Sequence, residues 1–276
     1  MTSDTAPLAS RKSEPKIRLV DLSKSFGGRP VLDHLNLEIA DGESVVLVGP
    51  SGTGKSVLLK HIIGLLRPDS GQVIIDGTDL WSLSDKDLNG FRRRFGMSFQ
   101  EGALFDSMTV FDNIAFPLRR QGKKKPDEIR RRVEECLDLV HLADIEHRKP
   151  AELSGGMRRR VGFARAIALE PEILLFDEPT TGLDPIMTDV IDSTIVEMRE
   201  RLQCTSVTIT HSMESAGKIG DRIALIFEGK IVEQKPPKEF LSSSNPLVRQ
   251  FVEGRAEGPM TKDDWGRRRQ ASGGHR

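Results

Sequence analysis

The segment Gly49–Ser56 contains the residues whose types and spacing indicate the clearest chemistry in the chain. It follows directly after an apolar run, Val45–Val48, and precedes a segment with helical character. Glycines inside the loop let the backbone curl with its N–H groups turned inward, which makes a nest for phosphate oxygens. An ordinary glycine-rich turn is the alternative, but the complete G-x-x-x-x-G-K-S pattern between strand and helix argues against it. The pattern predicts a nucleoside triphosphate site formed by Gly49, Pro50, Ser51, Gly52, Thr53, Gly54, Lys55, Ser56 and Val57.

Two carboxylates follow a second apolar run, Ile173–Phe176. This run predicts a buried strand, and open α/β sheets bind their ligands at the carboxyl ends of such strands. Asp177 is therefore expected to hold Mg²⁺ together with the Ser56 hydroxyl, and Lys55 is expected to reach the terminal phosphates. Glu178, one residue further on, is expected to polarise the attacking water. The alternative is an acidic strand end that faces solvent.

The segment Leu153–Met157 predicts a helix start with a second anion-binding end. Ser154 suits the N-cap position, and Gly155 and Gly156 let backbone N–H groups approach an anion closely. By itself the segment would be a plain capped helix. Its position about 100 residues after Lys55 favours a functional interpretation.

Composition excludes several classes of protein. The 276 residues contain 41 Lys and Arg against 41 Asp and Glu, so the net charge of zero argues against nucleic acid as a partner. Cys136 and Cys204 lie in apolar-patterned segments, which predicts reduced core cysteines and a reducing cytosolic setting. The chain has no apolar stretch long enough to cross a bilayer, and its N-terminus lacks the apolar region of a secretory signal.

The alternation of strand and helix patterns predicts an α/β fold with a mostly parallel sheet. A helical pattern from about Phe91 to Ala151 interrupts it, with one apolar face at Ile129, Val133, Cys136, Leu137 and Val140. Residues 1–15 are expected to form a disordered arm, 16–253 the main domain with a helical subdomain at about 98–165, and 254–276 a poorly packed tail with a possible anchor at Trp265. Strands are expected at Ile17–Val20, Leu35–Ile39, Ser44–Val48, Ile173–Phe176, Ser206–Ile209 and Ile223–Phe227, with hairpin turns at Asp76-Gly77 and Glu228-Gly229.

In the order and type of these motifs, residues Ile17 to Glu253 resemble the nucleotide-binding subunit of ATP-binding cassette (ABC) transporters. The resemblance implies a P-loop NTPase fold with an N-terminal antiparallel β-subdomain and an inserted α-helical subdomain. It also implies a dimer in which each ATP is bound between two copies. The implied roles are Glu178 as catalytic glutamate, His211 as the switch histidine that contacts the γ-phosphate, Ser154, Gly155 and Gly156 as the signature motif, and Asp184 in the D-loop. Gln100 is implied to bind ATP and Mg²⁺ from the loop that links the metal site to the helical subdomain, and Phe26 is implied to be the adenine-stacking ring.

Some of these residues have simpler interpretations. His211 could be an ordinary strand-end histidine, and Phe26 could be a core residue. Gln100 by itself indicates no function, and only the segment around it supports the assigned role. One position departs from the family pattern. The signature motif usually ends in Gln, whereas Met157 cannot donate the amide hydrogen bond. The Ser154 hydroxyl and the backbone amides remain, so we expect ATP hydrolysis to survive.

The segment from Glu101 to Leu118 and the C-terminal stretch Val248–Gly254 resemble the ATPases of Mce/Mla-type lipid transporters. This resemblance implies transport of lipids, for which phospholipids are the leading expectation, at the cytoplasmic face of the inner (plasma) membrane. The implied partners are a second copy of the chain, an integral-membrane permease and an MCE-type lipid-binding protein. A cassette for an amino acid, ion or drug is the alternative, followed by a soluble cassette protein of translation or DNA repair.

Overall fold

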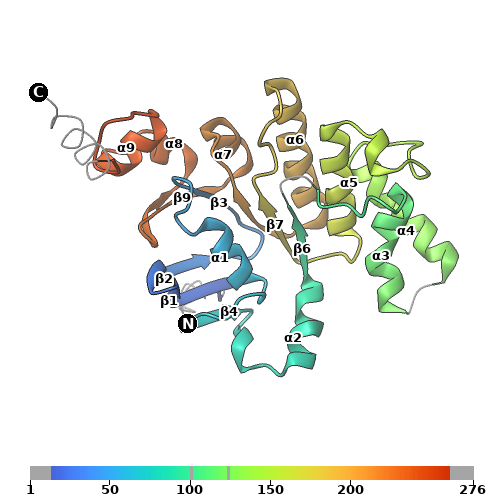
Figure 1. Ribbon diagram of the computed structural model, residues 1–276, viewed down its shortest axis with the longest axis horizontal. Helices are drawn as coiled ribbons and strands as arrows, with labels where there is room; N and C mark the ends of the chain where they lie inside the picture. Colours follow the sequence, from blue (N-terminus) through green and yellow to red (C-terminus); the bar gives the residue numbers. More distant parts are fainter. Residues whose placement is uncertain (1–13, 100–101, 123–124, 262–276) are drawn as a thin grey trace, which may run out of the picture.

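The protein is represented by a computed structural model that describes residues 14–99, 102–122 and 125–261 (Figure 1). Its centre is a sheet whose strands run in the order β10-β9-β3-β8-β7-β6. All neighbouring pairs from β9 to β6 are parallel, and β10 alone pairs antiparallel, with β9. The strands of this sheet are β3 (Ser44–Val48), β6 (Phe95–Ser98), β7 (Ile173–Asp177), β8 (Thr205–Ile209), β9 (Arg222–Phe227) and β10 (Lys230–Lys235).

A second, antiparallel sheet lies at the N-terminal side, as the resemblance implied. Its strand order is β2-β1-β4-β5, and the hairpin turn predicted at Asp76-Gly77 joins its last two strands. The turn between β9 and β10 contacts this sheet, because the Gly229 carbonyl accepts a hydrogen bond of 3.0 Å from the amide of Asp33. The strands are β1 (Ile17–Phe26), β2 (Arg29–Ile39), β4 (Ser70–Ile75) and β5 (Thr78–Asp79).

The edge strand β6 corrects the sequence analysis, which expected only helical structure in this part of the chain. Four residues containing a glycine give too short a pattern to distinguish a strand from a helix. Tertiary packing decides the outcome, since β6 pairs with β7 from Phe95↔Ile173 to Ser98↔Phe176. A β-carbon at Gly96 would lie 2.5 Å from the carbonyl oxygen of Ala166 in α5, so this helix packs directly on the backbone of β6.

The helices begin where the sequence provides caps. Ser84, Thr109, Ser154, Asp184 and Ser212 each accept a hydrogen bond at a helix N-terminus through the side chain. The α-helices are α1 (Lys55–Ile62), α2 (Asp85–Phe91), α3 (Val110–Gln121), α4 (Pro126–Leu139), α5 (Gly155–Ile167), α6 (Pro185–Leu202), α7 (Met213–Ile219), α8 (Pro237–Leu241) and α9 (Pro246–Val252). Among the described residues, no helix is both long and apolar enough to cross a membrane.

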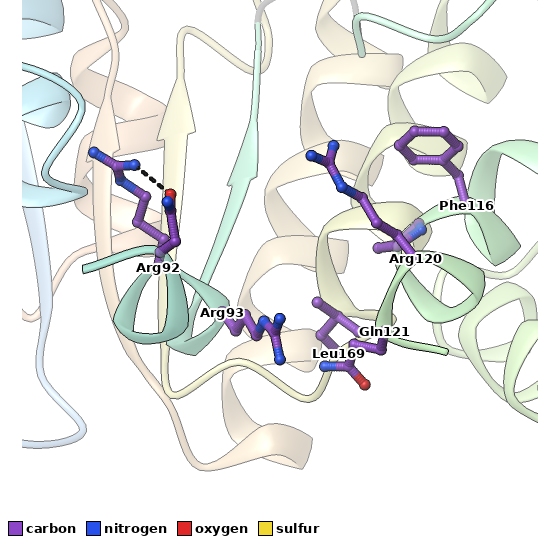
Figure 2. Close-up of a pocket in the computed structure, with 8 residues that line it drawn as sticks. Arg92, Arg93, Phe116, Arg120, Gln121 and Leu169 are labelled. Carbon is purple, nitrogen blue, oxygen red and sulfur yellow. Dashed lines mark hydrogen bonds between the residues drawn. The ribbon is translucent and has the colours of Figure 1, made fainter. Parts of the chain in front are cut away.

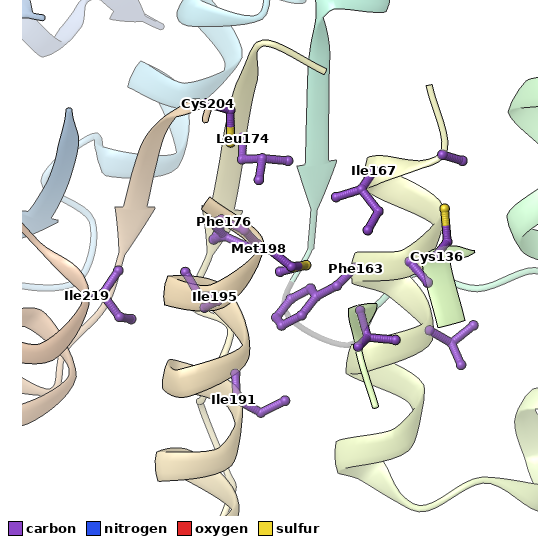
Figure 3. Close-up of a cluster of buried hydrophobic side chains, with 14 of the residues drawn as sticks. Cys136, Phe163, Ile167, Leu174, Phe176, Ile191, Ile195, Met198, Cys204 and Ile219 are labelled. Carbon is purple, nitrogen blue, oxygen red and sulfur yellow. The ribbon is translucent and has the colours of Figure 1, made fainter. Parts of the chain in front are cut away.

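Apolar side chains form two clusters on the two faces of the central sheet. Along β3 the side chains alternate, so that Val46 and Val48 belong to one cluster and Val45 and Leu47 to the other. The first cluster also contains the apolar face predicted for α4 and reaches α5 and α6 (Figure 3). Phe163 of α5 meets Phe176 of β7 edge to face, with ring centroids 5.2 Å apart. This contact attaches the inserted helices to the sheet.

Both cysteines are free and buried in the first cluster, which confirms the prediction of reduced core thiols. Burial raises the pKa of the Cys204 thiol to about 11, so this side chain stays protonated.

The C-terminal tail is better packed at its start than the sequence suggested. The Gln250 side chain is buried in α9 and binds the segment that follows, accepting a hydrogen bond of 2.8 Å from the Met260 amide. It also donates to the Arg255 carbonyl and the Thr261 hydroxyl. Trp265, proposed as an anchor, lies outside the described residues.

An ion-pair network holds the two sheets together. Glu172, just before β7, accepts hydrogen bonds of 2.7 Å from Arg94 and 2.7 Å from Lys16. Lys16 precedes β1 and also lies 3.0 Å from Asp76, in the turn after β4. The bond from Arg94, assisted by Lys16, lowers the pKa of the Glu172 carboxyl to about 2 against the opposing effect of burial.

The substitution Glu172→Gln should therefore lower the free energy of unfolding at neutral pH by about 1 kcal/mol, because solvent screens these partly exposed charges. A lowered pKa means that the contribution is complete above the ordinary value of 4.5 and is lost as the pH falls through about 2. Urea unfolding should show the difference between wild type and variant shrinking over that interval. Glu134→Gln, at an exposed carboxylate of α4, is the matched control. A difference that does not change with pH would contradict the assignment.

Candidate nucleotide site

The phosphate loop lies between β3 and α1, where the sequence placed it. Gly49 has a φ of 149°, and a β-carbon there would lie 2.3 Å from the carbonyl oxygen of Ile226 in β9. Gly54 caps α1 with a φ of 94°, and a β-carbon there would meet the carbonyl oxygen of Val31 at 2.8 Å. The loop is thus held between the central sheet and β2, which explains why these positions require glycine.

Lys55 is buried beneath this loop, with only 5% of the residue exposed. Its ammonium donates hydrogen bonds of 2.8 Å to the carbonyl oxygens of Gly49 and Pro50. Burial lowers the pKa of Lys55, while the carboxylates of Asp177 and Glu178 act in the opposite direction. The site therefore places a desolvated cation next to two acids at the end of β7.

Ser56 and Asp177 lie together, as a shared metal site requires. The Ser56 hydroxyl donates a hydrogen bond of 3.1 Å to Oδ1 of Asp177. Burial raises the pKa of Asp177, and the negative charge of Glu178 adds to this effect against the Ser56 bond. A hydroxyl and a carboxylate are hard oxygen donors of the kind Mg²⁺ prefers when phosphate and water complete its shell, so these residues fit that ion.

Glu178 and His211 form a pair just after the carboxyl ends of the neighbouring strands β7 and β8. Glu178 has a left-handed backbone with a φ of 51°, and its amide donates a hydrogen bond of 3.0 Å to the carbonyl of Ile209. Its Oε1 lies 3.1 Å from Nε2 of His211. Its Oε2 accepts a hydrogen bond of 3.0 Å from the Thr181 hydroxyl. Thr181 was not among the residues predicted from the sequence. The signal that could have identified it is a hydroxyl three residues after Glu178, because a turn brings two such side chains together.

The signature segment and the D-loop occupy two adjacent helix starts. The Ser154 hydroxyl caps α5 by accepting a hydrogen bond of 3.3 Å from the Met157 amide, and Asp184 caps α6 in the same way at 3.0 Å from Met187. Gly156 lies against this second start, since a β-carbon on it would lie 2.4 Å from the Met187 side chain. In the described part of the chain, no hydrogen bond joins Ser154 to the phosphate loop.

Three further residues, Phe26, Val57 and Gln100, were predicted to bind ATP, and the outcome differs for each of them. Phe26 ends β1 with 48% of its surface exposed, so it is not a core residue, and the Lys24 ammonium lies 5.6 Å from its ring centroid. Val57 packs against the second cluster. Gln100 lies outside the described residues. No group of three or more His, Cys, Asp or Glu that could hold a metal occurs among those described.

Comparison with known proteins identifies the family to which the chain belongs. A family model for ABC transporters matches residues 32–181. The chain is 46% identical over 244 residues to the probable ribonucleotide transport ATP-binding protein mkl of Mycobacterium leprae, which covers 88% of this chain and 70% of that protein. The chain belongs to the ABC transporter family. It is therefore an ATP-binding, ATP-hydrolysing transporter subunit, and its P-loop fold with an inserted helical region is that of an ABC ATPase.

Two further relatives refine the comparison. This ABC ATPase is 41% identical over 244 residues to the intermembrane phospholipid transport system ATP-binding protein MlaF of Haemophilus influenzae, covering 88% of the chain and 92% of that protein. It also matches the dimeric, post-hydrolysis structure of the ATP-binding cassette MJ0796 bound to ADP and phosphate. That match has a TM-score of 0.73 and 34% identity, and it covers 80% of this chain and 98% of the other.

Proposed function

We propose that this ABC ATPase works as a dimer with two shared ATP sites and powers lipid transport, with phospholipid as the cargo, through a separate permease. The observation that carries the catalytic part is the Glu178–His211 pair beside buried Lys55 and the Ser56–Asp177 contact. These groups come from the ends of three neighbouring strands. A fixed acid and a cation at one end of the sheet supply the orientation and charge stabilisation on which phosphoryl transfer relies.

The binding step follows from the phosphate loop. The ammonium of Lys55 would exchange the carbonyl oxygens of Gly49 and Pro50 for phosphate oxygens of ATP, which bind a cation more strongly. Ser56 and Asp177 would hold Mg²⁺, which neutralises charge on the phosphates when bound. Phe26, exposed at the end of β1, would stack on adenine. The loop amides and the start of α1 supply the remaining positive field.

The hydrolytic step follows from the orientation of Glu178. Both of its carboxylate oxygens have partners, His211 on one side and Thr181 on the other, so the side chain is held in one position. Glu178 would accept a proton from the water that attacks the terminal phosphate, and His211 would contact that phosphate. Fixed groups need little rearrangement in the transition state, which is how such sites lower the barrier.

The shared site is supported by the exposure of the signature segment. Ser154 is exposed at the start of α5, where its hydroxyl and the helix amides can meet a phosphate on another copy. Ile186, two residues after Asp184, is 77% exposed, although it is large and apolar. A second copy placed over these helix starts would cover Ile186 and complete both ATP sites. The dimeric relative with ADP and phosphate supports the same arrangement.

The permease is proposed to dock near the segment that follows Gln100. Phe99 and Phe105 are 41% and 42% exposed, and Phe105 packs against Phe116 in a tilted arrangement with ring centroids 4.9 Å apart. These rings line a cavity of about 390 Å³ between β6, α3 and α5. The buried Asn113 side chain fixes Phe105 by bonding both its amide and its carbonyl, at 2.8 and 3.2 Å. An exposed, positioned aromatic cavity is typical of a protein interaction site.

The proposals for the cargo and for the remaining partners depend on the names of the similar proteins. The name of MlaF specifies phospholipid transport, whereas that of mkl specifies ribonucleotide transport. MlaF matches along nearly its entire length, which favours a lipid cargo. An MCE-type lipid-binding protein and a location on the cytoplasmic face of the inner membrane belong to the same proposal.

Glu178→Gln should leave ATP binding intact and reduce phosphate release by about a hundredfold or more, because it removes the proton acceptor but keeps its shape. The trapped ATP should also hold two copies together, which light scattering can measure. Glu214→Gln, at an exposed carboxylate of α7, is the control. Phosphate release at the wild-type rate would reject Glu178 as the base.

Mixing two inactive variants tests the shared site. Lys55→Ala removes the phosphate-binding cation, and Ser154→Arg blocks the signature segment. In a mixed dimer one site combines both defects, while the other has neither. Hydrolysis should therefore reappear on mixing. If the intact site works alone, it should reach up to about half of the wild-type rate per mixed dimer, or about a quarter averaged over an equal mixture in which half of the dimers are mixed. Inactive mixtures that still form dimers would contradict a site built from two copies.

Purification in detergent from native membranes tests the cargo. The tagged chain should bring a permease and an MCE-type protein with it, and mass spectrometry should find phospholipid in the complex.

The variant Phe105→Ala should lose the permease while retaining ATP binding, because it removes one ring of the aromatic cavity. A complex with a ribonucleotide- or amino-acid-binding protein instead would overturn the lipid proposal.

A further inference from the structure

The exposed ring of Phe26 lies at a weakly supported end of β1. Pairing of β1 with β4 ends at Ser23↔Ser70, so among the described residues the last part of β1 has a paired strand on one side only. On that side the register with β2 shifts before and after Lys24, and Phe26 then meets Arg29 across the hairpin. Ordering a mobile side chain on binding costs free energy, so a ring that stacks on a base contributes most when it is already held in place. The position of Phe26 therefore depends on contacts outside these strands.

Asp69 supplies such contacts from the loop 64–69, which joins α1 to β4. Its Oδ2 accepts a hydrogen bond of 2.7 Å from the amide of Ser25, and its Oδ1 accepts one of 2.6 Å from the ammonium of Lys24. Its own amide donates to the carbonyl of Ser23 at 2.9 Å. The bonds from Lys24 and Ser25 lower the pKa of Asp69, so its side chain is an anion at neutral pH. One residue is thus bonded to the three consecutive residues that precede the ring.

Lys24 connects Asp69 to the ring itself. The Lys24 side chain is mostly buried, and its ammonium lies 5.6 Å from the centroid of the Phe26 ring. An ammonium at that distance is attracted to the face of an aromatic ring. Asp69 therefore acts on Phe26 by two routes, through the backbone at Ser25 and through the cation over the ring. The ring remains half-exposed, which leaves surface for a base.

The loop 64–69 is held in turn by His61, near the end of α1. The His61 side chain is fully buried, and its Nδ1 lies 2.7 Å from the carbonyl oxygen of Leu66. Burial lowers the pKa of His61, so the ring is neutral, and its Nδ1–H donates because a carbonyl oxygen can only accept. Since α1 begins at the phosphate loop, this contact connects the phosphate-binding end of the site to the loop 64–69.

A second contact holds the same loop from the other side. Arg92 lies in the short 3-10 helix Arg92–Arg94 that precedes β6, and it donates to the carbonyl of Gly64. Its guanidinium is oriented by a further hydrogen bond of 2.8 Å to the side chain of Asn89 (dashed line at Arg92 in Figure 2). The loop that carries Asp69 is therefore attached both to α1 and to the segment before β6, which makes it a fixed support.

We propose that Asp69 is a positioning residue for the base of the bound nucleotide. Together with Lys24, it holds Phe26 at a fixed distance from the phosphate loop, so that adenine stacks while the phosphates are bound. This inference rests on the proposed stacking of Phe26 on adenine and adds the residues that place the ring. Asp69 acts through the ring and does not itself contact the nucleotide. A ring that is in place before the nucleotide arrives adds affinity at little entropic cost.

The test compares a ligand that has a base with one that lacks it. ADP and pyrophosphate both carry two phosphates, and only ADP carries adenine, so titration calorimetry of the full-length chain with Mg²⁺ separates the two contributions. Asp69→Ala should weaken binding of ADP by about fivefold or more, as expected for loss of base stacking, and leave binding of pyrophosphate unchanged. In hydrolysis assays the same variant should raise KM for ATP while changing kcat by less than about twofold. Asp138→Ala, at an exposed carboxylate of α4, is the matched control.

A double-variant cycle shows whether Asp69 acts through Phe26. Phe26→Ala should itself weaken ADP binding by about fivefold or more. In the Phe26→Ala background, Asp69→Ala should weaken it by less than about twofold further, because the ring on which Asp69 acts is absent. Asp69→Asn keeps an oxygen for the Ser25 amide but loses the charge that holds Lys24, so it should give an intermediate loss.

The outcomes separate this inference from the function on which it rests. Unchanged ADP affinity in Phe26→Ala would reject adenine stacking and the positioning role together. A loss in Phe26→Ala with none in Asp69→Ala, or two losses that multiply in the double variant, would overturn the positioning role alone. Equal losses for ADP and pyrophosphate in Asp69→Ala would overturn it as well, since they would show that Asp69 supports the phosphate loop or the fold and not the ring.

Discussion

The parallel pairing of β3, β8 and β7 is the constraint on which the nucleotide site depends. Ile209 of β8 lies opposite Leu47 of β3 on one side and Asp177 of β7 on the other. The phosphate loop, the two acids and His211 therefore all lie at the carboxyl ends of these parallel strands, on the same side of the sheet. Side chains of these strands are buried on both faces, so a shift in register would place different residues in two packed layers and move these groups apart.

The inserted helices connect this edge to surfaces elsewhere on the molecule. Phe163 packs α5 on β7, and Arg159 of the same helix donates to the carbonyl of Thr181, which in turn positions Glu178. The segment at the start of α5 that was predicted to be the signature motif is thus attached to the chain region that orients Glu178. Arg165 of this helix donates to the carbonyls of Gly102 and Ala103, in the segment that leads to the aromatic cavity. One helix therefore contacts the region that orients Glu178, the surface proposed to face a second copy and the cavity proposed to receive the permease.

Prediction from sequence succeeded in locating the elements that a short local pattern specifies. The phosphate loop, the acids after β7 and the cap at Ser154 each need only neighbouring residues to be recognised. It failed for β6, whose identity as a strand depends on pairing with β7. Thr181 and Asn113 were also missed, because their importance lies in the side chain or backbone that each one contacts. The roles assigned to Phe26 and Asp184 remain predictions, while mixing the Lys55 and Ser154 variants addresses the role of Ser154.

The sequence by itself determined which groups can bind a triphosphate, since loop curvature, helix caps and buried strands follow from short-range backbone preferences. Only the tertiary structure decided which of these groups meet. The Glu178–His211 contact joins residues that follow two different strands, and the aromatic cavity combines walls from β6, α3 and α5. Such contacts depend on long-range packing and on the order of strands in the sheet, which no local pattern encodes.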